Sequence, residues 1–235
     1  MKNQVYNGPF GKLLRTIGFL AVLVGSLYLA TKMVLDPGNA ELPLIGNLTE
    51  FANLVNDQLA NVTFLNETAY VFLILSGGFI LLTWVLRKGL ILRVLLTVLL
   101  AVNFIFAAAT GDTFLAQMAV ISPDWLIELL QSIDSIYDEV VALSDYVIPG
   151  VALASAFFLW VLFAYKKPGR LSTFVLRMGT TSLFVAILMN FVANAFVTSL
   201  LDLEIFMTVM VALYLVTYLL FLLGSVLGVL GFTRK

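Results

Sequence analysis

Residues 69–109 read AYVFLILSGGFILLTWVL, then RKG, then LILRVLLTVLLAVNFIFAAA, and this stretch decides the fold. Each apolar run is long enough, at about 1.5 Å per helical residue, to cross a hydrocarbon core of about 30 Å. Because the basic turn between them is so short, the two runs must pack antiparallel as a transmembrane hairpin. The pattern recurs at residues 147–200 around a second basic turn, from Lys166 to Arg170. We therefore expect a membrane protein built on two hairpins in the same orientation.

The composition of the whole chain agrees with this expectation. Of its 235 residues, 61% are hydrophobic and 11% are charged, whereas soluble domains carry about 25% charged residues. The chain contains no cysteine and no histidine, which excludes disulfides, thiolate or imidazole metal sites, and cysteine or histidine catalysis. No phosphate-binding glycine loop, nucleophile elbow or basic nucleic-acid patch occurs. We expect no metal, no nucleic-acid partner, no enzyme activity and no cofactor, although a bound lipid is compatible with the sequence.

The hydropathy pattern predicts an all-α fold, with six transmembrane helices in a single domain over residues 1–235. The predicted spans are residues 17–35, 69–86, 90–109, 147–165, 171–200 and 205–232. Two polar segments, 36–68 and 110–146, are predicted to lie outside the membrane. Each contains an amphipathic helix by the spacing of its apolar residues, at 49–62 and at 122–140.

The charged residues are sorted by side. With both termini in the cytoplasm, Lys32 is the one basic residue that falls on the outer side, and every acid from Asp36 to Glu204 is external. Arg93 and Arg177 lie one to two turns into the membrane from the cytoplasmic side, where long side chains can reach back to the interface. The positive-inside rule therefore predicts cytoplasmic termini and a multi-pass protein of the cell membrane.

The two halves of the chain resemble each other. Each has an external amphipathic helix, an inward span, a basic turn and a returning span with an early Leu-Arg, at Arg93 and Arg177, and a later Asn-Phe, at Asn103 and Asn190. Either the hairpin has been duplicated in tandem, or positive-inside hairpins simply look alike.

Few residues within the spans could carry chemistry. No Asp or Glu lies in any predicted span, which argues against a proton-coupled transporter or an intramembrane protease. Arg93 and Arg177 are either interfacial anchors or paired cations around a cytoplasm-facing pocket for lipid headgroups or an anionic ligand. The amides of Asn103, Asn190 and Asn194 either hydrogen-bond between helices or line a substrate cavity. These five residues are the candidate ligand-binding set.

Small residues mark candidate helix-packing positions. They are Ala21 and Gly25 in the first span, Gly77 and Gly78 in the second, and Gly224, Gly228 and Gly231 in the last. Small residues at such spacing let helix backbones approach, either within the chain or at a dimer or partner face. The hydroxyls of Thr180, Thr181 and Ser182 are expected to bond back to their own helix. Trp84 and Trp160, near the inner ends of spans, fit an interfacial aromatic belt.

From about residue 51 to residue 111 the chain resembles the DoxX/DoxD family of small membrane proteins. The matching features are an external helix, a glycine-containing span (Ser76-Gly77-Gly78-Phe79), a basic turn and a returning helix with Arg93. The family's acid in the second span is missing here, and six spans exceed the family's usual four. The resemblance implies association with a quinone-linked oxidoreductase, but it carries over no redox residue.

These observations favour a non-catalytic membrane subunit that packs with the bilayer and with other membrane subunits or a second copy of itself, and so stabilises a larger membrane protein complex. One alternative is an uncoupled transport or binding protein for a small solute or lipid. A second alternative is the membrane subunit of a quinone-linked oxidoreductase, which rests on the resemblance alone.

The predicted sidedness can be tested by cysteine labelling, because the chain has no cysteine of its own. A cysteine placed by Ser135→Cys, in the second external segment, should react with a membrane-impermeant maleimide in intact cells. A cysteine placed by Gly89→Cys, in the basic turn, should react only after permeabilisation. The reverse pattern would overturn the orientation.

Overall fold

The structure is a computed structural model, and it describes residues 8–35, 52–54, 68–86, 89–109, 144–164, 170–197, 200 and 203–233. Within these residues the regular structure is helical and contains no strand, so the prediction of an all-α fold is confirmed. The long helices are α2 (Pro9–Leu35), α4 (Thr68–Leu86), α5 (Leu90–Ala109), α8 (Ser144–Phe163), α9 (Arg170–Phe196) and α10 (Glu204–Thr233).

These helices coincide with the six predicted spans, with shifts at the ends. The first begins earlier than expected, at Pro9, and α9 ends earlier, at Phe196. Within the described residues, three stretches are long and apolar enough to cross a membrane, Pro9–Leu35, Leu171–Ala193 and Glu204–Gly231, which indicates a membrane protein. The other apolar stretches are shorter: Val71–Leu86, Leu90–Asn103 and Val147–Phe163.

The predicted external helices lie largely outside the described residues. Residues 52–54, within the first of them, are helical. The second, at 122–140, falls wholly outside the described part of the chain.

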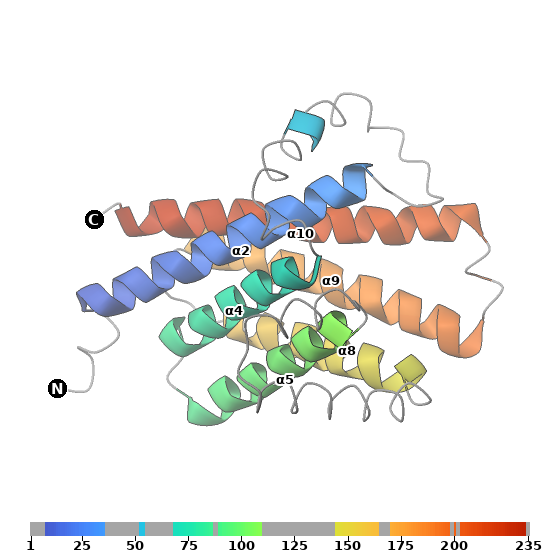
Figure 1. The fold of residues 1–235 in the computed structure, drawn as a ribbon, viewed down its shortest axis with the longest axis horizontal. Helices are drawn as coiled ribbons and strands as arrows, with labels where there is room; N and C mark the ends of the chain where they lie inside the picture. Colours follow the sequence, from blue (N-terminus) through green and yellow to red (C-terminus); the bar gives the residue numbers. More distant parts are fainter. Residues whose placement is uncertain are drawn as a thin grey trace, which may run out of the picture.

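The long helices run roughly along the same axis (Figure 1), and the contacts between them join them in a closed ring in chain order. Each packs chiefly against the helix before it and the helix after it, and α10 closes the ring by packing on α2. Successive helices run in opposite directions, so α2 begins and α10 ends at the same end of the bundle. Antiparallel packing of sequential neighbours is the arrangement that short connections favour.

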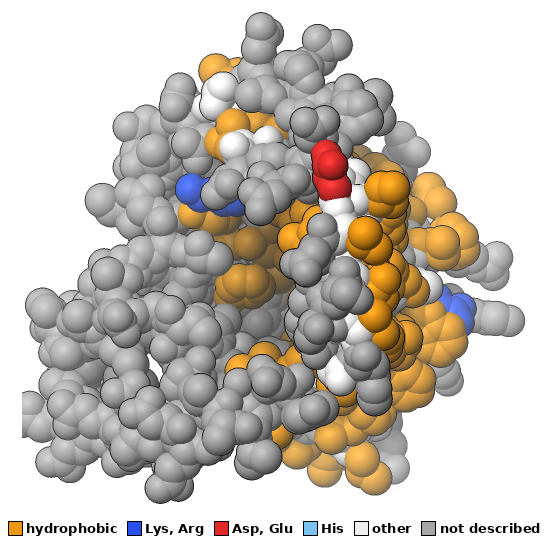
Figure 2. All heavy atoms as spheres, turned by 90° about the vertical axis from the view of Figure 1, so that its right-hand side faces the viewer, with side chains coloured by type: hydrophobic (Ala, Val, Ile, Leu, Met, Phe, Trp, Pro, Cys, Tyr) orange, Lys and Arg blue, Asp and Glu red, His pale blue; other side chains and the backbone are white. Residues whose placement is uncertain are grey.

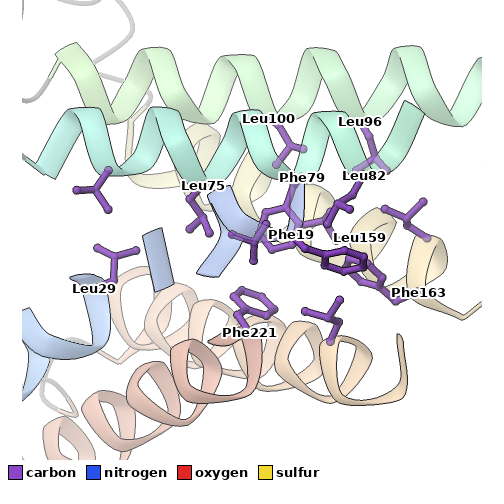
Figure 3. Close-up of a cluster of buried hydrophobic side chains, with 14 of the residues drawn as sticks. Phe19, Leu29, Leu75, Phe79, Leu82, Leu96, Leu100, Leu159, Phe163 and Phe221 are labelled. Carbon is purple, nitrogen blue, oxygen red and sulfur yellow. The ribbon is translucent and has the colours of Figure 1, made fainter. Parts of the chain in front are cut away.

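Phe79 of α4 fills the centre of this ring. Its ring meets Phe221 of α10 edge to face, with centroids 5.2 Å apart, and Phe163 of α8 in the same manner at 6.1 Å. Neither α8 nor α10 is a ring neighbour of α4, so these contacts reach across the bundle. Figure 3 shows Phe79 among side chains from several helices, including Phe19 and Leu96. Edge-to-face aromatic contacts add about 0.5–1.5 kcal/mol each beyond burial.

Glycines set the approach of α2 to α4. A Cβ built on Gly78 would lie 2.9 Å from the carbonyl oxygen of Gly18 and 3.0 Å from the Cβ of Ala21. Gly25, one turn after Ala21 on α2, faces Leu75: a Cβ added to Gly25 would lie 3.0 Å from the Cβ of Leu75. Two backbones this close leave no room for side chains, so Ala21, Gly25 and Gly78 lie at the helix contact together with Gly18, which the sequence analysis did not single out.

Bulky side chains fill the glycine positions of α10. A Cβ on Gly224 would meet Leu176 of α9 at 2.7 Å, and a Cβ on Gly228 would meet the ring of Phe19 of α2 at 2.6 Å. Gly77 and Gly231 differ, because within the described residues nothing lies within 4 Å of an added Cβ at either position. These two glycines are therefore not contacts between the chain's own described helices.

The outer surface of the ring is apolar as well. Every long helix exposes large hydrophobic side chains, for example Ile17 on α2, Val98 on α5 and Leu219 on α10. Figure 2 shows such side chains as a broad area on the described surface. Helices that are apolar on both their inner and outer faces are typical of membrane spans.

The adjacent glycines of α4 give a matched test of the close approach. Gly78→Ala should lower the free energy of unfolding by about 1–3 kcal/mol, because its Cβ meets the backbone of α2 and neither helix can move without repacking. Gly77→Ala should leave it unchanged or raise it by up to about 1 kcal/mol, since no described atom lies within 4 Å of its Cβ and alanine favours a helix more than glycine does. Thermal unfolding in mild detergent measures both. Equal effects would contradict the α2–α4 contact.

Candidate functional site

Asn103 joins two neighbouring helices. Its Nδ2 donates to the Oγ of Ser155 on α8 and to the carbonyl oxygen of Leu99 on its own helix, the latter at 2.9 Å. Ser155 Oγ in turn donates to the carbonyl oxygen of Val151 at 2.8 Å. The Asn103 amide thus forms a hydrogen bond between α5 and α8. Sequence reasoning missed Ser155, because a lone serine in an apolar run carries no signal of its partner.

The three asparagines are not gathered at one site. Asn190 is half-buried on α9 and takes part in an interaction of its own. In the ring, α8 lies between α5 and α9, so Asn103 and Asn190 belong to helices that are not neighbours. The side chain of Asn194 lies outside the described part of the structure.

Each candidate arginine lies over a tryptophan of the preceding helix. The guanidinium carbon of Arg93 on α5 is 5.4 Å from the ring centroid of Trp84 on α4. That of Arg177 on α9 is 4.0 Å from the ring centroid of Trp160 on α8. Cation–π contacts at such distances contribute about 0.5–2 kcal/mol, more where water is excluded. We call these contacts the Arg–Trp pairs. Each predicted hairpin therefore has one Arg–Trp pair, between its first and its second helix.

The two Arg–Trp pairs differ in exposure. Arg93 is only 5% exposed, while Trp84 is 40% exposed and therefore covers it from the outside. Trp84 is also fixed, because its indole Nε1 donates to Thr97 Oγ1 at 3.0 Å. In the second pair, both Arg177 and Trp160 are half-buried, so Arg177 keeps more exposure than Arg93. The sequence had assigned both tryptophans to an interfacial belt. The hairpin geometry, with Trp before the turn and Arg after it, was the signal that could have paired them.

A third arginine, Arg15 on α2, is also buried, at 7% exposure. It stands one turn before Phe19 on the inward face of α2, as Arg93 stands one turn before Leu96 on α5. Arg15 lies outside the first predicted span, which begins at residue 17. The helix instead begins at Pro9 and carries Arg15 into the bundle.

Two serines of α9 bond to α10. Ser172 Oγ donates to the carbonyl oxygen of Gly224 at 2.6 Å, and Ser182 Oγ donates to that of Leu213 at 2.9 Å. The expectation that Ser182 bonds to its own helix is therefore wrong: α10 approaches closely enough at Leu213 to offer an interhelical acceptor. Thr180 and Thr181 do bond within α9, both to the carbonyl oxygen of Arg177.

The described residues offer packing contacts and cations but little reactive chemistry. Among them, no group of three or more His, Cys, Asp or Glu side chains gathers to hold a metal ion. Among the described residues, the buried polar and charged side chains are serines, threonines and the two arginines Arg15 and Arg93. Comparison with known proteins adds nothing to this picture, since no protein-family model, no curated protein and no solved structure matches the chain.

The Asn103–Ser155 bond can be measured by a double-mutant cycle. Asn103→Leu and Ser155→Ala should each lower stability, and the two effects should be non-additive by about 0.6 kcal/mol, the average for interhelical hydrogen bonds in a membrane protein. The measurement is unfolding in detergent of the two single variants and the double variant. Strictly additive effects would mean that the two side chains do not interact.

Proposed function

We propose that this protein is a non-catalytic, six-span membrane subunit that packs with other membrane proteins and stabilises their complex. The proposal rests on one observation: polar and aromatic side chains inside the ring contact other helices of the same chain. Phe79 occupies the centre, and Asn103 is engaged by Ser155. Both donor hydrogens of the Asn103 amide are used within the protein, by Ser155 and by Leu99, and the centre is filled by Phe79, which supports packing as the role of the interior.

The outer face supports the same function. Large hydrophobic side chains cover all six long helices, so the surface suits lipid or the helices of a partner. Gly77 and Gly231, which lie away from the chain's own described helices, leave room for a closely approaching helix from another chain. The partner class proposed is therefore another membrane-spanning chain.

The proposed orientation puts both termini in the cytoplasm, in the cell membrane. Two observations support it: α2 begins at the end of the bundle where α10 finishes, and Arg15, Arg93 and Arg177 all lie toward that end of their helices. Lys32, in the last turn of α2, and Glu204, in the first turn of α10, lie at the opposite end. The paired Trp84–Arg93 and Trp160–Arg177 contacts also support a tandem duplication of the hairpin.

Purification in mild detergent followed by native mass spectrometry tests the subunit function. We expect stoichiometric partner chains, or a discrete homo-oligomer, to accompany this chain. A monomer that retains a small solute would contradict the proposal and favour the transport alternative.

The transport alternative is tested on residues. The double variant Asn103→Leu with Asn190→Leu should leave assembly nearly intact if these amides serve packing, because interhelical amide bonds contribute only about 0.6 kcal/mol each. Recovery of the complex by size-exclusion chromatography measures this. Intact assembly with loss of uptake in vesicles would instead identify a carrier.

A further inference from the structure

We infer that the outer surface of α8 and α9 around Arg177 binds the phosphate of an anionic phospholipid in the leaflet on the side of the chain termini. This inference rests on the proposed membrane-spanning arrangement, and it assigns one part of the outer surface to a lipid instead of a partner helix. It also distinguishes Arg177 from Arg93, which the sequence had treated as equivalent.

Arg177 is positioned by a layered aromatic contact. Its guanidinium carbon lies 4.0 Å from the Trp160 ring centroid. Trp160 is in turn stacked with Phe157, with centroids 6.4 Å apart and the ring planes 16° from parallel. A guanidinium held against an indole face keeps its N–H donors at its edge, in its own plane. That edge is the part of the group that binds phosphate in a bidentate manner.

The surface around this arginine suits a lipid molecule. Phe157 is 49% exposed on α8, and Phe174 and Met178, which flank Arg177 on α9, are 58% and 46% exposed. These side chains offer an apolar surface for an acyl chain beside a single fixed cation. Arg93 has no such access, because it is nearly fully buried beneath Trp84.

The depth of Arg177 matches a phospholipid headgroup. Helix α9 has 27 residues, or about 40 Å at 1.5 Å per residue, so it exceeds a hydrocarbon core of about 30 Å by roughly 5 Å at each end if it is centred. Arg177 lies seven residues after Arg170, the first residue of α9, which is about 10 Å along the axis. The guanidinium is therefore within reach of the interface, where arginine side chains extend toward phosphates.

The charge of the surrounding sequence selects an anionic lipid. Helix α9 contains no acidic residue, and the acid of α8, Asp145, is the second residue of that helix, at the end away from Trp160. The segment that joins the two helices contributes Lys166 and Lys167 to the sequence next to Arg170. A phosphate with net negative charge is favoured at such an end of a hairpin over a zwitterionic headgroup.

Trp160 itself can report the lipid. In a Trp84→Phe, Trp125→Phe background it is the remaining tryptophan of the chain, and bromine on a bound acyl chain quenches its fluorescence. The protein is reconstituted in phosphatidylcholine vesicles with increasing brominated phosphatidylglycerol or, separately, brominated phosphatidylcholine. We expect quenching by the anionic lipid at about fivefold lower mole fraction, the ratio that the attraction of one basic side chain to a net negative headgroup provides. Arg177→Gln should bring the two lipids to within about twofold of each other, while Arg177→Lys should retain part of the preference.

Two comparisons decide the outcome. Lys12→Gln, which removes an exposed cation at the same end of the bundle, should keep the full preference. Loss of the preference in both variants would mean a diffuse charge effect and overturn the site. Equal quenching by the two lipids in the background variant would overturn the lipid site but leave the membrane span intact. No quenching by either lipid would count against the membrane arrangement itself.

Native mass spectrometry of the chain with all its tryptophans provides an independent readout. Phosphatidylglycerol should remain bound to the unsubstituted protein and dissociate from the Arg177→Gln variant, and inorganic phosphate added in excess should not displace it, because the acyl chains also bind. Equal lipid retention by the two proteins would overturn the inference.

Discussion

The contacts of Phe79 across the bundle are the constraint on which the rest of the ring depends. In hydrocarbon, an apolar side chain gains nothing by leaving lipid for protein, so helices associate through shape, close approach and polar bonds. Phe79 meets Phe163 and Phe221 edge to face on two helices that are not its neighbours. These two contacts fix how closely α8 and α10 approach α4. A smaller residue in place of Phe79 would leave a void, and the side chains around it would lose their dispersion contacts.

Neighbouring helices around the ring are held together by two kinds of specific contact. At α2–α4 and α2–α10, glycine admits the backbone or the ring of a neighbour, as at Gly78 and Gly228. At α9–α10 and α5–α8, a side-chain hydroxyl or amide donates across the interface, from Ser182 and Asn103. The Arg–Trp pairs add electrostatic attraction within each hairpin. Each interface thus has a specific contact that lipid cannot replace.

The positions of the helices could be read from the sequence, but the partners of particular residues could not. Hydropathy located α4 and α5 to within a residue, since a long apolar run in a chain with few charges has one low-energy conformation in lipid. Gly77 and Gly78 were indistinguishable in sequence, yet only Gly78 faces α2. The hydroxyl of Ser182 was expected to bond within its own helix, although it donates a hydrogen bond to the carbonyl oxygen of Leu213 on α10. One position along a helix is a rotation of about 100°, which the sequence of an evenly apolar helix does not fix.

The sequence by itself determined that this protein is helical and apolar, that its cations other than Lys32 belong to one end of its helices, and that it lacks the thiols and imidazoles of most metal and redox chemistry. These properties depend on residue type and on order along the chain. The tertiary structure decided that Asn103 bonds to Ser155, that Arg93 is buried while Arg177 is only half-buried, and that a phenylalanine fills the centre. Those outcomes depend on helix rotation and on which helices are neighbours, and both are set by packing between segments far apart in sequence.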